Sequence, residues 1–194
     1  VIAAALAPTV ETGPDNLSDL LFLQAIYDLG GGGYFDAAAG KPYGFDSGPD
    51  DRRVSANVLN FSHIILLREE MVRRGDEAKP LWGSNFGWNA LPAGWSGPPS
   101  VWGSVTAEQQ QAHTRAAYAR AATEWPWLGG LIVQHWQPAA PADDPLQGFA
   151  LAPVIADWLA DGGPLAEDGM IPGVYPAQNP YTSYSGNWQF SDLG

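Results

Sequence analysis

Residues 60–89, NFSHIILLREEMVRRGDEAKPLWGSNFGWN, contain a helix that leads into a strand, and this unit decides the fold. Apolar side chains between Phe61 and Met71 recur at helical spacing, and Gly75 ends the pattern. The following run, residues 79–88, predicts a short strand. A helix that alternates with strands is typical of α/β proteins with a parallel sheet.

The part of the chain before this unit has the same alternation. Residues 1–11 form a run of small apolar side chains, which predicts a strand buried on both faces. Residues 17–29 predict a helix, since helix-capping residues come before it and a run of glycines follows it. A second strand is expected within residues 33–45, with Pro42 near its end.

The part after residue 89 continues the alternation. Thr106 and Gln109 form a capping-box pattern, which predicts a helix from there to about Glu124. Residues 129–138 predict a fourth strand, and residues 152–160 predict a short helix. The chain therefore holds about four β/α units.

Four units are half of a (β/α)8 barrel, since a complete barrel has eight units and roughly 250 residues. We predict an α/β fold of the TIM-barrel type in which residues 1–162 form a half-barrel. Residues 163–194 are rich in Gly, Pro and aromatic residues. We expect them to form an irregular or β tail, or a link to an accessory β domain.

Composition disfavours several classes of function. The 194 residues are 45% hydrophobic, which suffices for one domain with a sizeable core. Acidic side chains number 21 and basic ones 9, and the net charge of -12 disfavours nucleic acids and anionic membranes as partners. The chain has no cysteine, and its three histidines are too scattered to be metal ligands. We predict neither a metal nor a cofactor.

The sequence also bears on the location of the protein. No apolar run approaches the roughly 20 residues of a membrane span, and no basic segment precedes the opening apolar run as in a signal peptide. We expect a soluble chain, with secretion left open. We also expect Val1 to be a processed or truncated start.

Several stretches resemble one family of enzymes. LAPTVE, YFDAAAGKPYGF, the helix-strand stretch quoted above and EWPWLGGLIVQHWQP are similar to the C-terminal half of bacterial retaining glycoside hydrolases with a (β/α)8 fold, the cellulase and β-xylosidase-like group. The resemblance covers residues 1 to about 160. It implies that the predicted strands correspond to barrel strands five to eight, and that β-linked glycans are the ligands.

The most specific part of the resemblance is the strand that ends in Asn85, Phe86, Gly87 and Trp88. The family has Glu-Phe-Gly-Trp here, and this Glu is the nucleophile, so Asn85 occupies the nucleophile position. An amide is not nucleophilic and carries no charge to stabilise an oxocarbenium-like transition state. The family's Asn-Glu-Pro segment, which carries the acid/base, would lie before Val1 and occurs nowhere in the sequence.

Retaining hydrolysis needs two carboxyl groups about 5 Å apart. Glu11, after the first predicted strand, is the best-placed remaining carboxylate, and a solvated loop charge is the alternative interpretation.

Residues that bind substrate are expected near the carboxyl ends of the strands, where barrel enzymes carry their active sites. Large aromatic side chains there are as often packed in the core as exposed to a ligand. The expected binding residues are Lys41, Tyr43, Trp88, Asn89 and Trp136.

Three functions stay open at this level. The chain is a fragment of a glycoside hydrolase, a carbohydrate-binding pseudoenzyme, or a structural half-barrel. A half-barrel leaves open strand edges, and association buries them. We expect an oligosaccharide or polysaccharide as ligand, a homodimer or a complementing half-barrel chain as partner, and impaired turnover by this chain alone.

Overall fold

The computed structural model describes residues 1–136 and 143–151 of the chain. Its parallel sheet contains β1 (Ala38–Gly40), β2 (Leu81–Phe86) and β3 (Leu128–Val133), which neighbour one another in chain order. The predicted α/β class is confirmed. The helix expected over residues 152–160 and the tail expected over residues 163–194 lie outside the described residues. Short 3-10 helices occur at Gly31–Tyr34 (η1), Phe61–His63 (η2) and Pro145–Phe149 (η3).

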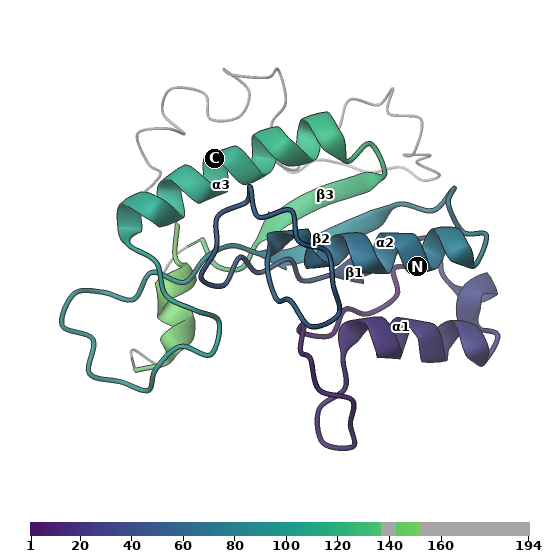
Figure 1. Ribbon diagram of the computed structural model, residues 1–194, viewed down its shortest axis with the longest axis horizontal. Helices are drawn as coiled ribbons and strands as arrows, with labels where there is room; N and C mark the ends of the chain where they lie inside the picture. The colour runs from purple at the N-terminus through teal and green to yellow at the C-terminus, as the bar shows by residue number, and fades with distance from the viewer. Residues whose placement is uncertain (137–142, 152–194) are drawn as a thin grey trace, which may run out of the picture.

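Each strand is preceded by a helix, and Figure 1 shows the helices side by side in the order α1 (Asp19–Asp28), α2 (Ile64–Arg73) and α3 (Ala107–Glu124). All three lie within the predicted ranges. The capping box of α3 is confirmed, because the Thr106 hydroxyl accepts a hydrogen bond from the Gln109 N–H at 3.2 Å, and the Gln109 side chain accepts one from the Thr106 N–H at 2.9 Å. No helix in the described ranges is long and apolar enough to cross a bilayer.

The hydrophobic core lies between the helices and one face of the sheet. Phe61, Leu67 and Met71 pack in one cluster with Leu81 and Phe86 of β2, and each of these side chains is at most 2% exposed. The apolar face expected for residues 60–75 therefore covers the strand that follows it, as the opening sequence predicts.

Alternate strand residues lie on the other face of the sheet, which we call the open face. It carries Trp82, Ser84 and Ile132, and the alternate residues that follow them along the same strands. Each of these three side chains is more exposed than the residue before it on its strand. Ile132 is 49% exposed, which is unusual for isoleucine in a strand. The open face is thus partly apolar and accessible at β3.

The prediction that residues 1–11 form a strand buried on both faces is wrong. This segment makes a single parallel bridge to the sheet, between Ile2 and Ala37. Val1 and Ile2 are 80% and 52% exposed. A parallel strand is buried on both faces only where it lies within a sheet that is covered on each face, and among the described residues this segment meets the sheet only at the Ile2–Ala37 bridge and its adjacent hydrogen bonds.

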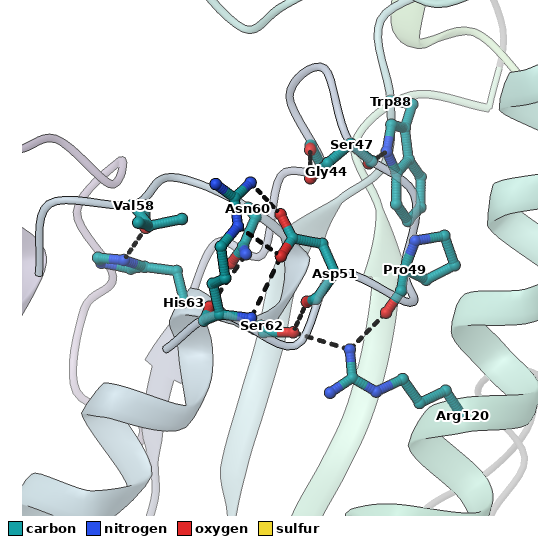
Figure 2. A network of polar contacts seen from close by, with 11 residues as sticks. Gly44, Ser47, Pro49, Asp51, Val58, Asn60, Ser62, His63, Trp88 and Arg120 are labelled. Atoms are coloured by element: carbon teal, nitrogen blue, oxygen red, sulfur yellow. Dashed lines mark hydrogen bonds and ion pairs between the residues drawn. The ribbon is translucent and has the colours of Figure 1, made fainter. Parts of the chain in front are cut away.

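The long connection from β1 to α2, residues 41–60, is anchored by polar side chains (Figure 2). Arg120 of α3 is 7% exposed, and its guanidinium donates hydrogen bonds to the Pro49 carbonyl and, at 2.7 Å, to the Ser62 hydroxyl. The Ser62 hydroxyl donates in turn to the Asp51 carbonyl. A buried guanidinium is stable only when such acceptors surround it, so this network ties the loop to α3 and to the start of α2.

Arg120→Ala should lower the free energy of unfolding by about 1–3 kcal/mol, because it leaves buried neutral acceptors without a donor. Urea denaturation followed by circular dichroism measures this change. Arg53→Ala is the matched control: Arg53 is 69% exposed and pairs with Asp51. The Asp51 side chain is 12% exposed, but because Arg53 is largely exposed this pair should be worth about 1 kcal/mol or less. Equal losses in the two variants would contradict an anchoring role for Arg120.

A buried ion pair joins α1 to η2. The Nε2 atom of His63 lies 3.0 Å from Asp19 Oδ1, and its Nδ1 atom lies 3.0 Å from the Val58 carbonyl oxygen. Both charged side chains are at most 4% exposed. Burial lowers the pKa of His63, but the hydrogen bond and charge of Asp19 outweigh burial, so the pKa lies above its ordinary value.

His63→Gln should cost more stability at about pH 5.5 than at about pH 8.5. A raised folded-state pKa means that the contribution of His63 is complete below its unfolded pKa of about 6.5 and is lost as pH rises through the folded value. Urea denaturation of both proteins at each pH gives the difference. His113→Gln is the control, since burial lowers the pKa of His113 and should reverse the trend. A His63 effect that is independent of pH would contradict the ion pair.

Candidate functional site

Polar and aromatic side chains collect at the carboxyl ends of β2 and β3. Asn85 stands near the end of β2, and Gln134 and Trp136 follow β3 in the alternation that begins at Ile132. The Gln134 N–H donates to the Phe86 carbonyl oxygen at 3.0 Å, so the segment after β3 stays paired with the end of β2. Ligands of parallel α/β sheets bind at this end of the strands.

A β-bulge sets the direction of the Asn85 side chain. Between Gly83 and Phe86, β2 advances by three residues while β3 advances by two. Ser84 and Asn85 are both partly exposed, whereas Gly83 and Phe86 are buried. Ser84 Oγ lies 3.4 Å from Asn85 Oδ1 and donates to the Gly40 carbonyl oxygen at 3.2 Å. The bulge therefore places Asn85 beside Ser84 on the open face, away from the helices.

Two further predicted residues are accessible at this end. Trp136 is 45% exposed, so part of its indole surface is available to a ligand. His135, beside it, is partly buried, and its carbonyl accepts a hydrogen bond from the Leu151 N–H at 3.3 Å. Lys41 follows β1 and is partly buried. The arrangement therefore offers one indole, two amides and one ammonium group at the ends of adjacent strands.

The prediction that Trp88 and Asn89 contact substrate is wrong, because both are 0% exposed. The Trp88 indole N–H donates to the Ser47 carbonyl oxygen at 2.6 Å (Figure 2), and its ring lies 5.6 Å from that of Phe61. Asn89 Nδ2 donates to the Pro145 carbonyl oxygen at 2.7 Å. These side chains hold loops and the core together, so neither is available to a sugar.

Glycine at two positions allows this burial. Gly87 has a φ of 142°, a conformation that other residues rarely adopt, and it turns the chain before Trp88. A Cβ atom on Gly44 would lie 1.9 Å from the indole of Trp88. The indole therefore fills the space that a side chain at residue 44 would need.

Gly44→Ala should lower the free energy of unfolding by about 1–3 kcal/mol, because the added methyl group must displace a buried indole. The midpoint of urea denaturation and the wavelength of tryptophan fluorescence both measure this displacement. Gly33→Ala is the matched control, since nothing lies within 4 Å of its Cβ position. It should be neutral or slightly stabilising. A Gly44→Ala variant as stable as the Gly33→Ala variant would contradict the tight packing of Trp88.

The ring of Tyr43 is also buried, at 4% exposure, so the prediction that it binds substrate directly is wrong. Its hydroxyl nevertheless reaches the site and donates to Gln134 Oε1 at 2.8 Å. Burial raises the pKa of Tyr43 to about 12. Sequence reasoning missed Gln134, although its place between Ile132 and Trp136 in the alternation was a usable signal.

Glu11 lies in an exposed hairpin closed by a bridge between Thr12 and Leu17, and Figure 1 shows this hairpin projecting away from the sheet. Its carboxylate accepts hydrogen bonds from Asn16 Nδ2 at 3.2 and 3.3 Å and from the Thr9 hydroxyl at 3.4 Å. These contacts are local, which agrees with the alternative interpretation of Glu11 as a loop charge.

Other loop acids serve the backbone. Asp46 accepts a hydrogen bond from the Ser104 N–H, and Asp144 accepts one from the Leu146 N–H at the start of η3, both at 2.9 Å. Within residues 1–136 and 143–151, no His, Asp and Glu side chains group in a way that could hold a metal ion. The site can donate and accept hydrogen bonds and can stack on a ligand, and its amides are not nucleophiles.

Comparison of the chain with known proteins finds no matching family model, no matching curated protein and no matching solved structure. The resemblance to glycoside hydrolases and the roles that it implies stay predictions.

Proposed function

We propose that the chain is a glycoside hydrolase-type half-barrel that binds β-linked glycans at the carboxyl ends of its strands and does not hydrolyse them alone. One observation carries this proposal. A bulge aims Asn85 onto the open face of β2, while Gln134 and the exposed indole of Trp136 follow the adjacent strand β3.

The order of the strands supports a barrel-type fold. β1, β2 and β3 are neighbours in chain order, and the amino-terminal segment bridges to Ala37 beside β1. Doubly wound sheets reverse their order at a switch point, and the described part of this sheet contains no reversal. Parallel strands in unbroken order are what one sector of a (β/α)8 barrel requires.

The chemistry of the side chains favours binding over hydrolysis. Amides donate to and accept from sugar hydroxyls, and an exposed indole offers a flat apolar surface to a sugar ring. Hydrolysis with retention needs two carboxyl groups about 5 Å apart. In the described residues, the side-chain polar contacts of Asn85 and Gln134 are made with Ser84, Tyr43 and His135, and none involves a carboxylate.

A second candidate function, assembly with a copy of itself or with a complementing half-barrel chain, rests on exposed apolar residues. Val1 and Ile2 at the edge of the sheet are 80% and 52% exposed, and Ile132 on the open face is 49% exposed. Association through the strand edge would bury these side chains. The mass of the chain in solution separates a dimer from a monomer.

Titration of cellohexaose and xylohexaose, followed by calorimetry and tryptophan fluorescence, tests glycan binding. We expect Trp136→Ala to weaken binding at least about ten-fold, equivalent to ~1.4 kcal/mol. Tyr34→Ala is the matched control, because Tyr34 is an 83% exposed aromatic residue on η1, which precedes β1 and so belongs to the other end of the sheet. The absence of binding to either hexaose would overturn the proposal, and a dimeric mass would then favour assembly.

Aryl β-glycosides test the catalytic part of the proposal. The unmodified chain should release no aryl group, because an amide at residue 85 cannot form a glycosyl-enzyme intermediate. Asn85→Glu restores a carboxylate at that position and serves as the comparison. Turnover by the unmodified chain that survives Asn85→Ala would contradict the assignment of the nucleophile position.

A further inference from the structure

Gln134 is held by its neighbours in one orientation. Its carbonyl oxygen accepts a hydrogen bond from the Tyr43 hydroxyl at 2.8 Å, and its Nε2 atom lies 3.4 Å from His135 Nε2. The backbone of Gln134 is also fixed, because its N–H donates to the Phe86 carbonyl oxygen at 3.0 Å. Gln134 as a residue is partly exposed at the end of β3.

Tyr43 is a rigid donor for this contact. Its ring is 4% exposed and packs against Phe149, Trp102 and Phe45, with centroid distances of 5.2, 6.4 and 6.4 Å. Burial raises the pKa of Tyr43 to about 12, so the phenol keeps its proton at neutral pH. The phenol therefore donates to one of the two lone pairs of the Gln134 carbonyl oxygen and fixes the orientation of the amide.

With one lone pair of its carbonyl oxygen engaged by Tyr43, Gln134 still has its amino group and the second lone pair for a ligand. The amino nitrogen Nε2 lies 3.4 Å from His135 Nε2, and no other contact of this nitrogen occurs among the described residues. Because the Tyr43 hydroxyl already orients the Gln134 amide, the amino group loses little conformational entropy when it binds a ligand. A donor held in this way favours ligands that place an acceptor oxygen opposite it.

We propose that Gln134 is a ligand-binding residue that donates a hydrogen bond through its side-chain amino group, and that Tyr43 is the residue that positions it. The group it binds is an acceptor oxygen, which in a glycan is a hydroxyl or ring oxygen. This inference rests on the proposed glycan binding. Adjacent strands lie about 4.8 Å apart, so Asn85 on β2 and Gln134 after β3 can contact the same sugar unit.

Gln134→Glu tests the donor role. A carboxylate keeps the acceptor for the Tyr43 hydroxyl and removes both amide hydrogens, so the affinity for the hexaose that binds should fall about ten-fold or more. Gln134→Leu should give a similar loss. Affinity that is unchanged or higher in Gln134→Glu would show that Gln134 accepts rather than donates, and would overturn the inference.

Tyr43→Phe tests the positioning role. It keeps the packed ring and frees the Gln134 amide to turn, so affinity should fall about three- to ten-fold. In a Gln134→Leu background, the same change should have no further effect, because there is no amide left to position. A loss of equal size in both backgrounds would mean that Tyr43 acts through general structure. Tyr118→Phe, which removes another partly buried hydroxyl, should leave affinity unchanged.

The outcomes separate this inference from the proposed function. Hexaose binding that depends on Trp136 but not on Gln134 or Tyr43 overturns the inference and leaves glycan binding in place. The absence of binding to both hexaoses overturns both. A further readout needs no ligand: the side-chain amide signals of Gln134 in nitrogen-15 NMR spectra should shift in Tyr43→Phe and stay in place in Tyr118→Phe.

Discussion

The guanidinium of Arg120 lies in the interior between α3, the loop after β1 and the first turn before α2. Its Nε–H pairs with Glu124 at 3.0 Å, and its Nη1 group relies on the Pro49 carbonyl and the Ser62 hydroxyl as acceptors, so loss of these buried contacts would cost about 1–3 kcal/mol. A loop without regular structure thereby gains a defined path. The position of Trp88, after the carboxyl end of β2, depends on this loop, because the loop provides the Ser47 carbonyl that accepts a hydrogen bond from the indole.

Burial of Trp88 in turn shapes the site beside it. The indole fills the space over Gly44, and the turn at Gly87 directs the chain into the loop that leads to α3. Before this turn Ser84 and Asn85 of β2 stay partly exposed, because the bulge between Gly83 and Phe86 brings Asn85 beside Ser84. The site is therefore a short strip across the ends of β2 and β3, supported from behind by the ring of Tyr43 and its bond to Gln134.

Sequence reasoning located the strands that carry the site better than it located the side chains. Asn85 and Trp136 were assigned to strand ends and are partly exposed and exposed there, respectively, whereas Trp88, Asn89 and Tyr43 were assigned to the same ends and are buried. The reason is physical: large aromatic rings and amides serve equally well in a core and in a groove. Gln134 was overlooked because its significance comes from Tyr43, which is 91 residues away in the chain.

Local chemistry in the sequence determined the helices and their order with the strands. Helical spacing of apolar residues marked α1 and α2, and the reciprocal contacts of Thr106 and Gln109 marked the start of α3, because these signals act over a few neighbouring residues. Only the tertiary structure decided that residues 1–11 make a single bridge beside β1 and that β2 carries a bulge. Burial and register are properties of pairs of distant segments, and a strand becomes buried only when neighbours cover both its edges and its faces.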